Sequence, residues 1–153
     1  MSKVTILFKK LVPEAKAPAR AHDGDAGWDV TAVEAWSEHN CDENNCIICY
    51  RTGLAFAIPK GYWIDVRPRS SVFHTGLIMS NSCGVVDSGY RSEVMAVFYC
   101  IPGYNRDEYS RGDRIAQLIV QPALTTDVEF VEVDELPPSD DGRGEGGFGS
   151  TGR

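Results

Sequence analysis

The chain has 153 residues and a mass of 16.8 kDa, which suits one domain and leaves no room for two ordinary ones. Its formal net charge of −7 argues against a broad nucleic-acid surface, because such a surface needs clustered lysine and arginine. No apolar run approaches the roughly 18 residues that a membrane helix needs, and the N-terminus lacks the apolar core of a signal peptide. We therefore expect a cytoplasmic protein (nuclear or in the host cytosol if viral), neither secreted nor bound to membranes or nucleic acid.

The five cysteines are an odd number, which predicts free thiols in a reducing compartment. His39, Cys41, Cys46 and Cys49 supply four zinc-type ligands within eleven residues. However, residues 46–50 have the pattern of a strand, in which positions 46 and 49 face opposite sides. We therefore favour thiols over a structural zinc site. The cysteines are Cys41, Cys46, Cys49, Cys83 and Cys100.

Apolar and polar residues alternate with period 2 along most of the chain, which is typical of strands. The pattern predicts strands at residues 4–8, 46–50, 54–58, 62–66, 94–99, 115–120 and 128–133. The turn Pro59-Lys60-Gly61 predicts a hairpin, and the phase slips at residues 130–131 as a β-bulge would cause. The one expected helix is a short turn after Arg69-Ser70-Ser71, with serine as its cap. Many short strands with Gly/Pro turns favour an all-β sandwich, barrel or jelly roll.

The composition changes after Glu135. We expect a β-barrel domain over residues 1–136 and a linker with a glycine-rich tail over residues 137–153. One interpretation of this tail is a disordered terminus, as in most chains. The other is a loop that closes over a phosphorylated ligand, because glycine lets backbone N–H groups converge on oxyanions.

Four further motifs lie at turns between the predicted strands. They are residues 26–32 (AGWDVTA), 68–72 (PRSSV), 84–91 (GVVDSGYR) and 112–119 (GDRIAQLI). Together with the tail, in this order, they resemble the five motifs of the homotrimeric dUTPase family, over almost the whole chain. The resemblance implies a jelly-roll or distorted β-barrel and a homotrimer with shared active sites. It also implies hydrolysis of dUTP to dUMP and pyrophosphate with Mg²⁺.

The third motif carries the chemistry that this resemblance implies. Asp87 matches the aspartate that activates water, and a carboxylate is a modest base that relies on positioning. Tyr90 matches the ring beneath the deoxyribose, which excludes a 2′-hydroxyl by steric contact. Asn81, Val86 and Met95 match positions of the uracil slot. From the residues alone, Asp87 could equally cap the turn that follows it, and Tyr90 could be an ordinary core or surface ring.

The other motifs match a phosphate-binding region. Arg69, Ser70 and Ser71 match the residues that hold the α- and β-phosphates, and Gln117 matches a further phosphate ligand. Gln117 could instead pair across the sheet. Asp29 matches an aspartate that contacts Mg²⁺ through water. In the tail, the matching residues are Arg143 at the γ-phosphate, Phe148 on the uracil, and Gly149, Ser150 and Thr151 around the phosphates.

The sequence departs from the family pattern in a few places, and other functions remain open. Trp28 replaces the usual leucine, Ser71 the common glycine, and an acidic stretch at about residues 34–45 has the character of an insertion. A dCTP deaminase of the same fold is the alternative enzyme, with Glu93 as its one candidate acid near the base. A nucleotide-sensing or protein-binding module without turnover is the other alternative.

Overall fold

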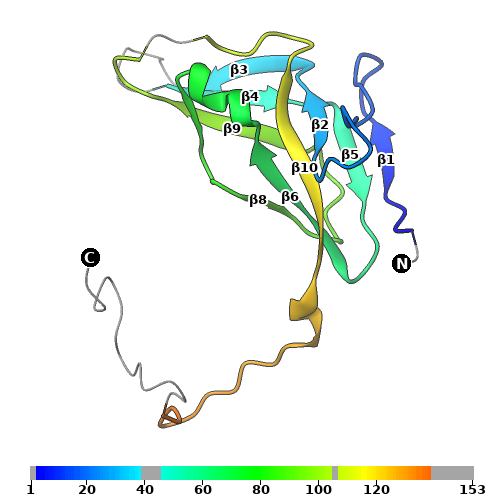
Figure 1. Cartoon of the computed structure of the whole chain (residues 1–153), viewed down its shortest axis with the longest axis vertical. Helices are drawn as coiled ribbons and strands as arrows, with labels where there is room; N and C mark the ends of the chain where they lie inside the picture. The colour runs from blue at the N-terminus through cyan, green and yellow to red at the C-terminus, as the bar shows by residue number, and fades with distance from the viewer. Residues whose placement is uncertain (1–2, 39–45, 105–106, 139–153) are drawn as a thin grey trace.

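The computed structural model describes residues 3–38, 46–104 and 107–138, and it confirms the all-β prediction. Two four-stranded antiparallel sheets form the body (Figure 1). The first contains, in spatial order, β2 (Trp28–Thr31), β10 (Arg114–Pro122), β6 (Tyr62–Pro68) and β8 (Gly84–Val86). The second contains β3 (Glu34–Glu38), β4 (Ile47–Arg51), β9 (Met95–Cys100) and β7 (Leu77–Met79). A separate pair joins β1 (Leu7–Lys10) to β5 (Leu54–Ala57).

Both sheets contribute side chains to one hydrophobic core. Ile64 and Val66 enter it from β6, while Tyr50 and Phe98 enter it from β4 and β9. The rings of Tyr50 and Phe98 meet edge to face with centroids 5.8 Å apart, a favoured aromatic geometry. Burial, together with the nearby Glu108 carboxylate, raises the pKa of Tyr50. Buried and more exposed residues alternate along β9, as the sequence pattern predicts, whereas β4 and β6 each contain three consecutive buried residues.

The short helix is where the sequence places it, but its cap differs. It is a 3₁₀-helix, η1 (Ser70–His74), and its N-cap is Arg69, which forms no side-chain capping hydrogen bond. The expected serine cap is therefore wrong, because the helix already begins at Ser70. A second 3₁₀-helix, η2 (Leu124–Asp127), follows β10 and was not expected.

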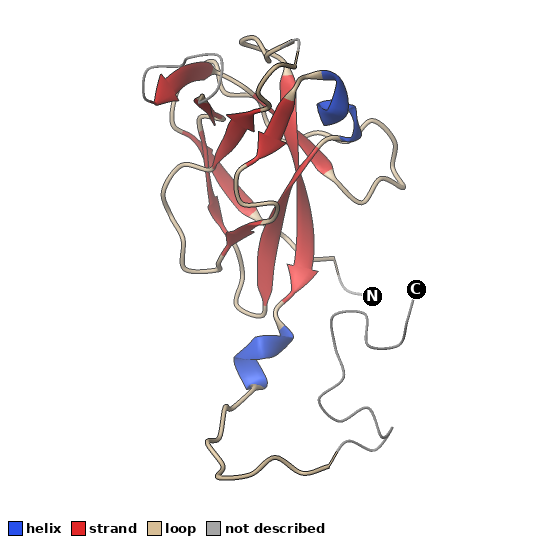
Figure 2. Cartoon of the chain, turned by 90° about the vertical axis from the view of Figure 1, so that its left-hand side faces the viewer, coloured by secondary structure: helices blue, strands red, loops and turns tan. Residues whose placement is uncertain are grey.

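Two strand predictions are wrong. The predicted hairpin does not form, because β5 pairs with β1 whereas β6 lies between β10 and β8. Residues 128–133 form no strand; the segment after η2 extends away from the barrel (Figure 2). Phe130 and Val131 are 96% and 69% exposed there. An extended segment becomes a strand only when a partner satisfies its backbone groups, and this segment has none within the described part of the chain.

The cysteines also differ from expectation in part. Cys83 and Cys100 carry free thiols, whereas Cys46 is disulfide-bonded, so the expectation of free thiols throughout is wrong. Counting cysteines does not show which of them the fold brings together. His39 and Cys41 lie outside the described residues. In the stretch at about 34–45, β3 occupies the first five residues and pairs with β4, and residues 39–45 lie outside the described residues. In the described residues, no helix is long and apolar enough to span a membrane.

Candidate active site

Three adjacent strands gather the predicted phosphate-binding residues. In the register of the first sheet, Gln117 on β10 pairs with Asp29 on β2 and with Arg67 on β6. Arg69 and Ser70 follow directly where β6 ends. All of these residues except Arg67 line a polar cavity of about 300 Å³. It is lined by Ala21, Asp25, Ala26, Gly27, Asp29, Arg69, Ser70, Arg114, Gln117 and Ile119.

Asp29 lies between two arginines in this cavity. Arg69 Nε donates to Oδ1 of Asp29 at 3.0 Å, and Arg114 Nη1 donates to Oδ2 at 3.0 Å. The Asp29 side chain is 16% exposed, so these charge-assisted bonds are partly shielded from water. Arg114 is a site residue that sequence reasoning missed, although it stands inside the fourth motif, three residues before Gln117. The pairing orients both guanidinium groups toward the same cavity.

Gly27 makes room for Gln117. A Cβ atom at residue 27 would overlap the end of the Gln117 side chain and lie 3.0 Å from its Cβ. The first motif therefore needs glycine so that the amide of Gln117 can occupy the cavity beside Asp29. Cross-sheet pairing, the alternative for Gln117, holds for its backbone, while its side chain lines the cavity.

Ser70 and Ser71 lie on different sides of Arg69. Ser70 lines the cavity that contains Asp29, whereas Ser71 lines a neighbouring polar cavity of about 320 Å³ with His74 and Tyr109. Arg69 lines both cavities, and its Nη1 lies 3.4 Å from Ser71 Oγ. The second motif thus presents hydroxyl groups to both sides of one guanidinium group.

The third motif forms a tight turn after β8. The backbone N–H of Tyr90 donates to the carbonyl of Asp87 at 3.1 Å, and the Tyr90 hydroxyl donates to the carbonyl of Glu93 at 3.0 Å. It is therefore the main-chain oxygen of Asp87 that closes this turn, and its carboxylate is exposed. Tyr90 and Met95 are about two-fifths exposed, while Val86 is buried.

Asn81 lies on the loop before β8, and that loop is attached to β6 through Cys83. The Cys83 thiol donates to Asp65 Oδ1 at 2.9 Å, and Arg67 Nε donates to the other oxygen of Asp65 at 2.8 Å. Asp65 is 4% exposed, so the pair of donors satisfies a buried carboxylate. The hydrogen bond to Asp65 raises the pKa of Cys83, with partial burial acting in the same direction.

The two groups of residues lie far apart in one chain. Val86 pairs with Ile64, so Asp87 lies near the start of β6, while Arg69 lies beyond its end. The six steps along the chain from Trp63, next to Ile64, to Arg69 span roughly 20 Å at about 3.3 Å per strand residue. Figure 1 shows the turn after β8 and helix η1 at opposite ends of β6. A single chain therefore does not bring Asp87 next to the phosphate-binding cavity.

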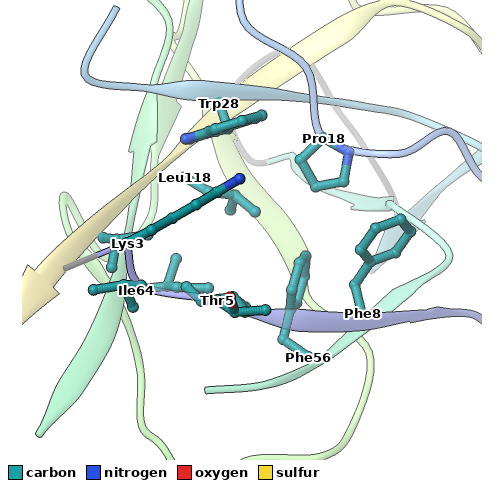
Figure 3. A pocket seen from close by; sticks show the side chains of 11 residues that line it. Lys3, Thr5, Phe8, Pro18, Trp28, Phe56, Ile64 and Leu118 are labelled. Carbon is teal, nitrogen blue, oxygen red and sulfur yellow. The ribbon is translucent and has the colours of Figure 1, made fainter. Parts of the chain in front are cut away.

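An apolar cavity of about 340 Å³ lies elsewhere, between the N-terminal segment and the first sheet (Figure 3). Phe8, Phe56, Leu118 and Trp28 are among its walls, and none of the predicted site residues lines it. The Arg20 guanidinium stacks over the Trp28 ring, 4.5 Å from its centroid. Trp28 therefore contributes to this apolar cavity, while its neighbour Asp29 faces the polar one.

The predicted tail residues lie outside the described residues. They are Arg143, Phe148, Gly149, Ser150 and Thr151.

Asp29 fits an indirect contact with magnesium better than direct coordination. In the part of the chain that the structure describes, no group of three or more His, Cys, Asp or Glu residues could hold a metal ion. Each Asp29 oxygen already accepts one hydrogen bond from an arginine. A carboxylate oxygen has two lone pairs, so each can also accept from a metal-bound water. The donor set thus fits an ion that arrives on an anionic ligand.

Comparison with known proteins identifies the family. The family model described as dUTPase matches residues 13–152. The chain belongs to the dUTPase family. It is similar to deoxyuridine 5′-triphosphate nucleotidohydrolases of Thermobifida fusca (41% identical, covering 97% of this chain and 79% of the relative) and Tropheryma whipplei (39%, covering 98% and 95%). A relative from Mycobacterium leprae is 42% identical, covering 94% of this chain and 92% of its own.

Solved dUTPase structures share the fold. A dUTPase of Staphylococcus bacteriophage 80alpha with dUpNHpp superposes with a TM-score of 0.75 at 29% identity, covering 97% of this chain and 99% of its own. A mutant dUTPase from phage phi11 of S. aureus, described with a structural Mg(II) ion, has a TM-score of 0.70 at 25% identity, covering 86% of this chain and 97% of its own. The dUTPase fold of this chain is thus supported by sequence and by structure.

Proposed function

We propose that this dUTPase-family chain is a dUTP diphosphatase in which Asp87 activates the attacking water. The observation that carries this proposal is the polar cavity formed by Asp29, Arg69 and Gln117, which belongs to a chain of the dUTPase family. Water attacks the α-phosphorus, the bond to the bridging oxygen breaks, and pyrophosphate leaves with dUMP as the other product. Asp87 accepts the proton of the water, and its exposed carboxylate supports this role.

The phosphate groups are proposed to bind in the cavity at Arg69. A triphosphate carries about four negative charges, and arginine pairs with phosphate oxygens by two parallel hydrogen bonds. Arg114 shares Asp29 with Arg69, so both guanidinium groups are held before the ligand arrives. Ser70 and Gln117 add neutral hydrogen-bonding groups in the same cavity, and Ser71 adds a hydroxyl from the neighbouring cavity that Arg69 also lines. Preorganised groups of this kind stabilise developing charge without reorganising during the reaction.

Mg²⁺ is proposed to enter with the triphosphate rather than to reside on the protein. When bound, it neutralises phosphate charge and polarises the phosphoryl oxygens. Asp29 would hold it through water, because each of its carboxylate oxygens has a second lone pair that can accept from a metal-bound water. The protein's own part is to orient the phosphates through Arg69 and Gln117.

Uracil and deoxyribose are proposed to bind at the third motif. Tyr90 packs beneath the sugar, Asn81 and Val86 line the uracil slot, and Met95 closes its back. The tail residues Arg143, Phe148, Gly149, Ser150 and Thr151 are proposed to cover the bound nucleotide.

The complete site is proposed to be shared between chains of a homotrimer. The roughly 20 Å between Asp87 and Arg69 in one chain supports this arrangement, because the α-phosphate must reach both at once. In a closed trimer, one chain can present its third motif to the phosphate-binding cavity of another. The tail would come from a neighbouring chain.

The reaction is tested by pyrophosphate release. The assay compares dUTP, dCTP, dTTP and UTP with Mg²⁺ present, and we expect release from dUTP far above the other three. Binding of dUTP without release would instead identify a nucleotide-sensing module. Ammonia release from dCTP would identify a deaminase. Glu93, the candidate acid of a deaminase, binds Arg51 and the backbone N–H of Gly53, which favours a structural role for it.

The shared site is tested by complementation. An Asp87→Asn chain and a chain ending at Ser139 should each be nearly inactive. Refolded together, they form some sites with Asp87 from the shortened chain and a tail from the other, so activity should partly return. A mixture that stays inactive, with mixed trimers verified by native mass spectrometry, would contradict the shared site while leaving the chemistry unaffected.

A further inference from the structure

Glu93 anchors the end of the turn that carries Asp87 and Tyr90. Its side chain is 14% exposed, and its two carboxylate oxygens accept from different donors. Arg51 Nε donates to Oε2 at 2.9 Å, and the backbone N–H of Gly53 donates to Oε1 at 2.7 Å. Both donors belong to the junction between β4 and β5, so one carboxylate ties the third motif to a different part of the fold.

The junction that receives Glu93 is itself firmly held. Gly53 has φ +68°, and a Cβ there would lie 2.8 Å from Val12 and 2.9 Å from Ala15. The Gly53 carbonyl accepts from the backbone N–H of Leu11 at 2.8 Å. The buried Thr52 hydroxyl donates to the carbonyl of Val94, the residue after Glu93, at 2.6 Å. The anchor point therefore cannot shift without disturbing packing on two sides.

A short series of hydrogen bonds leads from this anchor to Tyr90. The Glu93 carbonyl accepts the Tyr90 hydroxyl at 3.0 Å, and the Tyr90 backbone N–H donates to the Asp87 carbonyl at 3.1 Å. The Tyr90 ring is about two-fifths exposed, so packing covers only part of it and the hydrogen bond from its hydroxyl helps to hold it in place. The position of the Tyr90 ring relative to the turn therefore depends on the position of the Glu93 backbone.

We propose that Glu93 is a positioning residue that sets the selectivity for deoxyribose over ribose through Tyr90. This inference rests on the proposed function, in which the Tyr90 ring excludes a 2′-hydroxyl. The Tyr90 ring can exclude ribose only if it is held in a fixed position, because the 2′-hydroxyl adds a single oxygen atom to the sugar. A ring displaced by about 1 Å would admit the ribose, and displacements of that size change rates by up to about 10²-fold.

The test variant is Glu93→Gln. Glutamine keeps the size of the side chain and an oxygen for the Gly53 N–H, but it places an amide group against Arg51 Nε–H. We expect the ratio of kcat/KM for UTP to that for dUTP to rise about tenfold, with a smaller fall in kcat for dUTP. Arg51→Lys should move the ratio in the same direction by less, and it serves if Glu93→Gln does not fold by circular dichroism.

Glu34→Gln is the matched control. Glu34 is the other carboxylate on Arg51, with Oε2 2.8 Å from Nη1, but it is 60% exposed and belongs to β3. Its removal alters the same arginine without touching Glu93. The UTP/dUTP ratio should therefore stay at the wild-type value.

Combination with Tyr90→Ala separates positioning from general destabilisation. If Glu93 acts through the Tyr90 ring, Glu93→Gln should add nothing to the UTP/dUTP ratio of Tyr90→Ala. A wild-type ratio in Glu93→Gln, an equal change in Glu34→Gln, or a full additional change in the Tyr90→Ala background would each overturn the inference. A wild-type chain without dUTP turnover would overturn the proposed function as well, so wild-type activity and the Tyr90→Ala ratio distinguish the two failures.

Discussion

The polar cavity at Arg69, where we propose that the phosphates bind, and the turn after β8 are built in opposite ways. Strand register brings Asp29 and Gln117 together within one sheet, Arg69 follows directly after β6, and an ion pair joins Arg69 to Asp29. Asp87 and Tyr90 instead occupy an exposed turn beyond the sheet, which hydrogen bonds hold in shape. One chain therefore forms the whole cavity. The turn also has its shape within one chain, but it lies at the other end of β6 from the cavity in which we propose that the phosphates bind.

This difference predicts how substitutions in the cavity and in the turn would affect function. A substitution in the cavity disturbs side chains that contact one another, so its effect should appear mainly in substrate binding. A substitution in the turn changes Asp87 or Tyr90, whose proposed contact is with the substrate. Its effect should therefore appear in the chemical step or in selectivity. The predictions below test this contrast.

Asp87→Asn should give the largest effect. Asparagine keeps the shape of the side chain but cannot take a proton, so kcat should fall by about 10²–10⁴-fold. The affinity for a non-hydrolysable dUTP analogue, measured by calorimetry, should stay near that of the wild type. A loss of affinity as large as the loss of rate would show that Asp87 is structural.

Tyr90→Ala should raise activity on UTP relative to dUTP. The steric barrier to the 2′-hydroxyl disappears, and barriers of this size are worth about 10–200-fold in kcat/KM. Pyrophosphate release with both nucleotides measures the ratio. An unchanged ratio would mean that the ring does not select the sugar.

Gly27→Ala should act on binding. The new Cβ would displace the Gln117 side chain from the cavity, so KM for dUTP should rise about tenfold while kcat changes less. Gln117→Ala provides the control, because Gly27→Ala should cost much less in that background. Equal effects in both backgrounds would show that Gly27 matters for a reason other than room for Gln117.

Alkaline pH should have the smallest effect, on stability alone. The raised pKa of Tyr50 keeps its hydroxyl protonated in the folded chain at a pH where the same tyrosine in the unfolded chain, with an ordinary pKa of 10.0, loses its proton. The folded state then binds more protons, so the melting temperature should fall as the pH rises above about 10. Tyr50→Phe should weaken this dependence, whereas Tyr99→Phe, at a ring 48% exposed, should leave it as in the wild type. Identical pH profiles for the three chains would contradict the assignment.

The sequence by itself determined the fold class and supplied the candidate site residues. Period-2 alternation marks strands because successive side chains face opposite sides, and the motif residues Asp29, Arg69 and Gln117 do gather as their resemblance to a family implies. The tertiary structure alone decided which strands pair. It joined β5 to β1 instead of β6, left residues 128–133 without a partner in the described chain, and placed Arg114 beside Asp29. Alternation fixes the faces of a strand but not its neighbours, since pairing depends on contacts between residues far apart in the chain. For the same reason, only the register of β6 with β8 revealed that Asp87 and Arg69 of one chain lie at opposite ends of a strand.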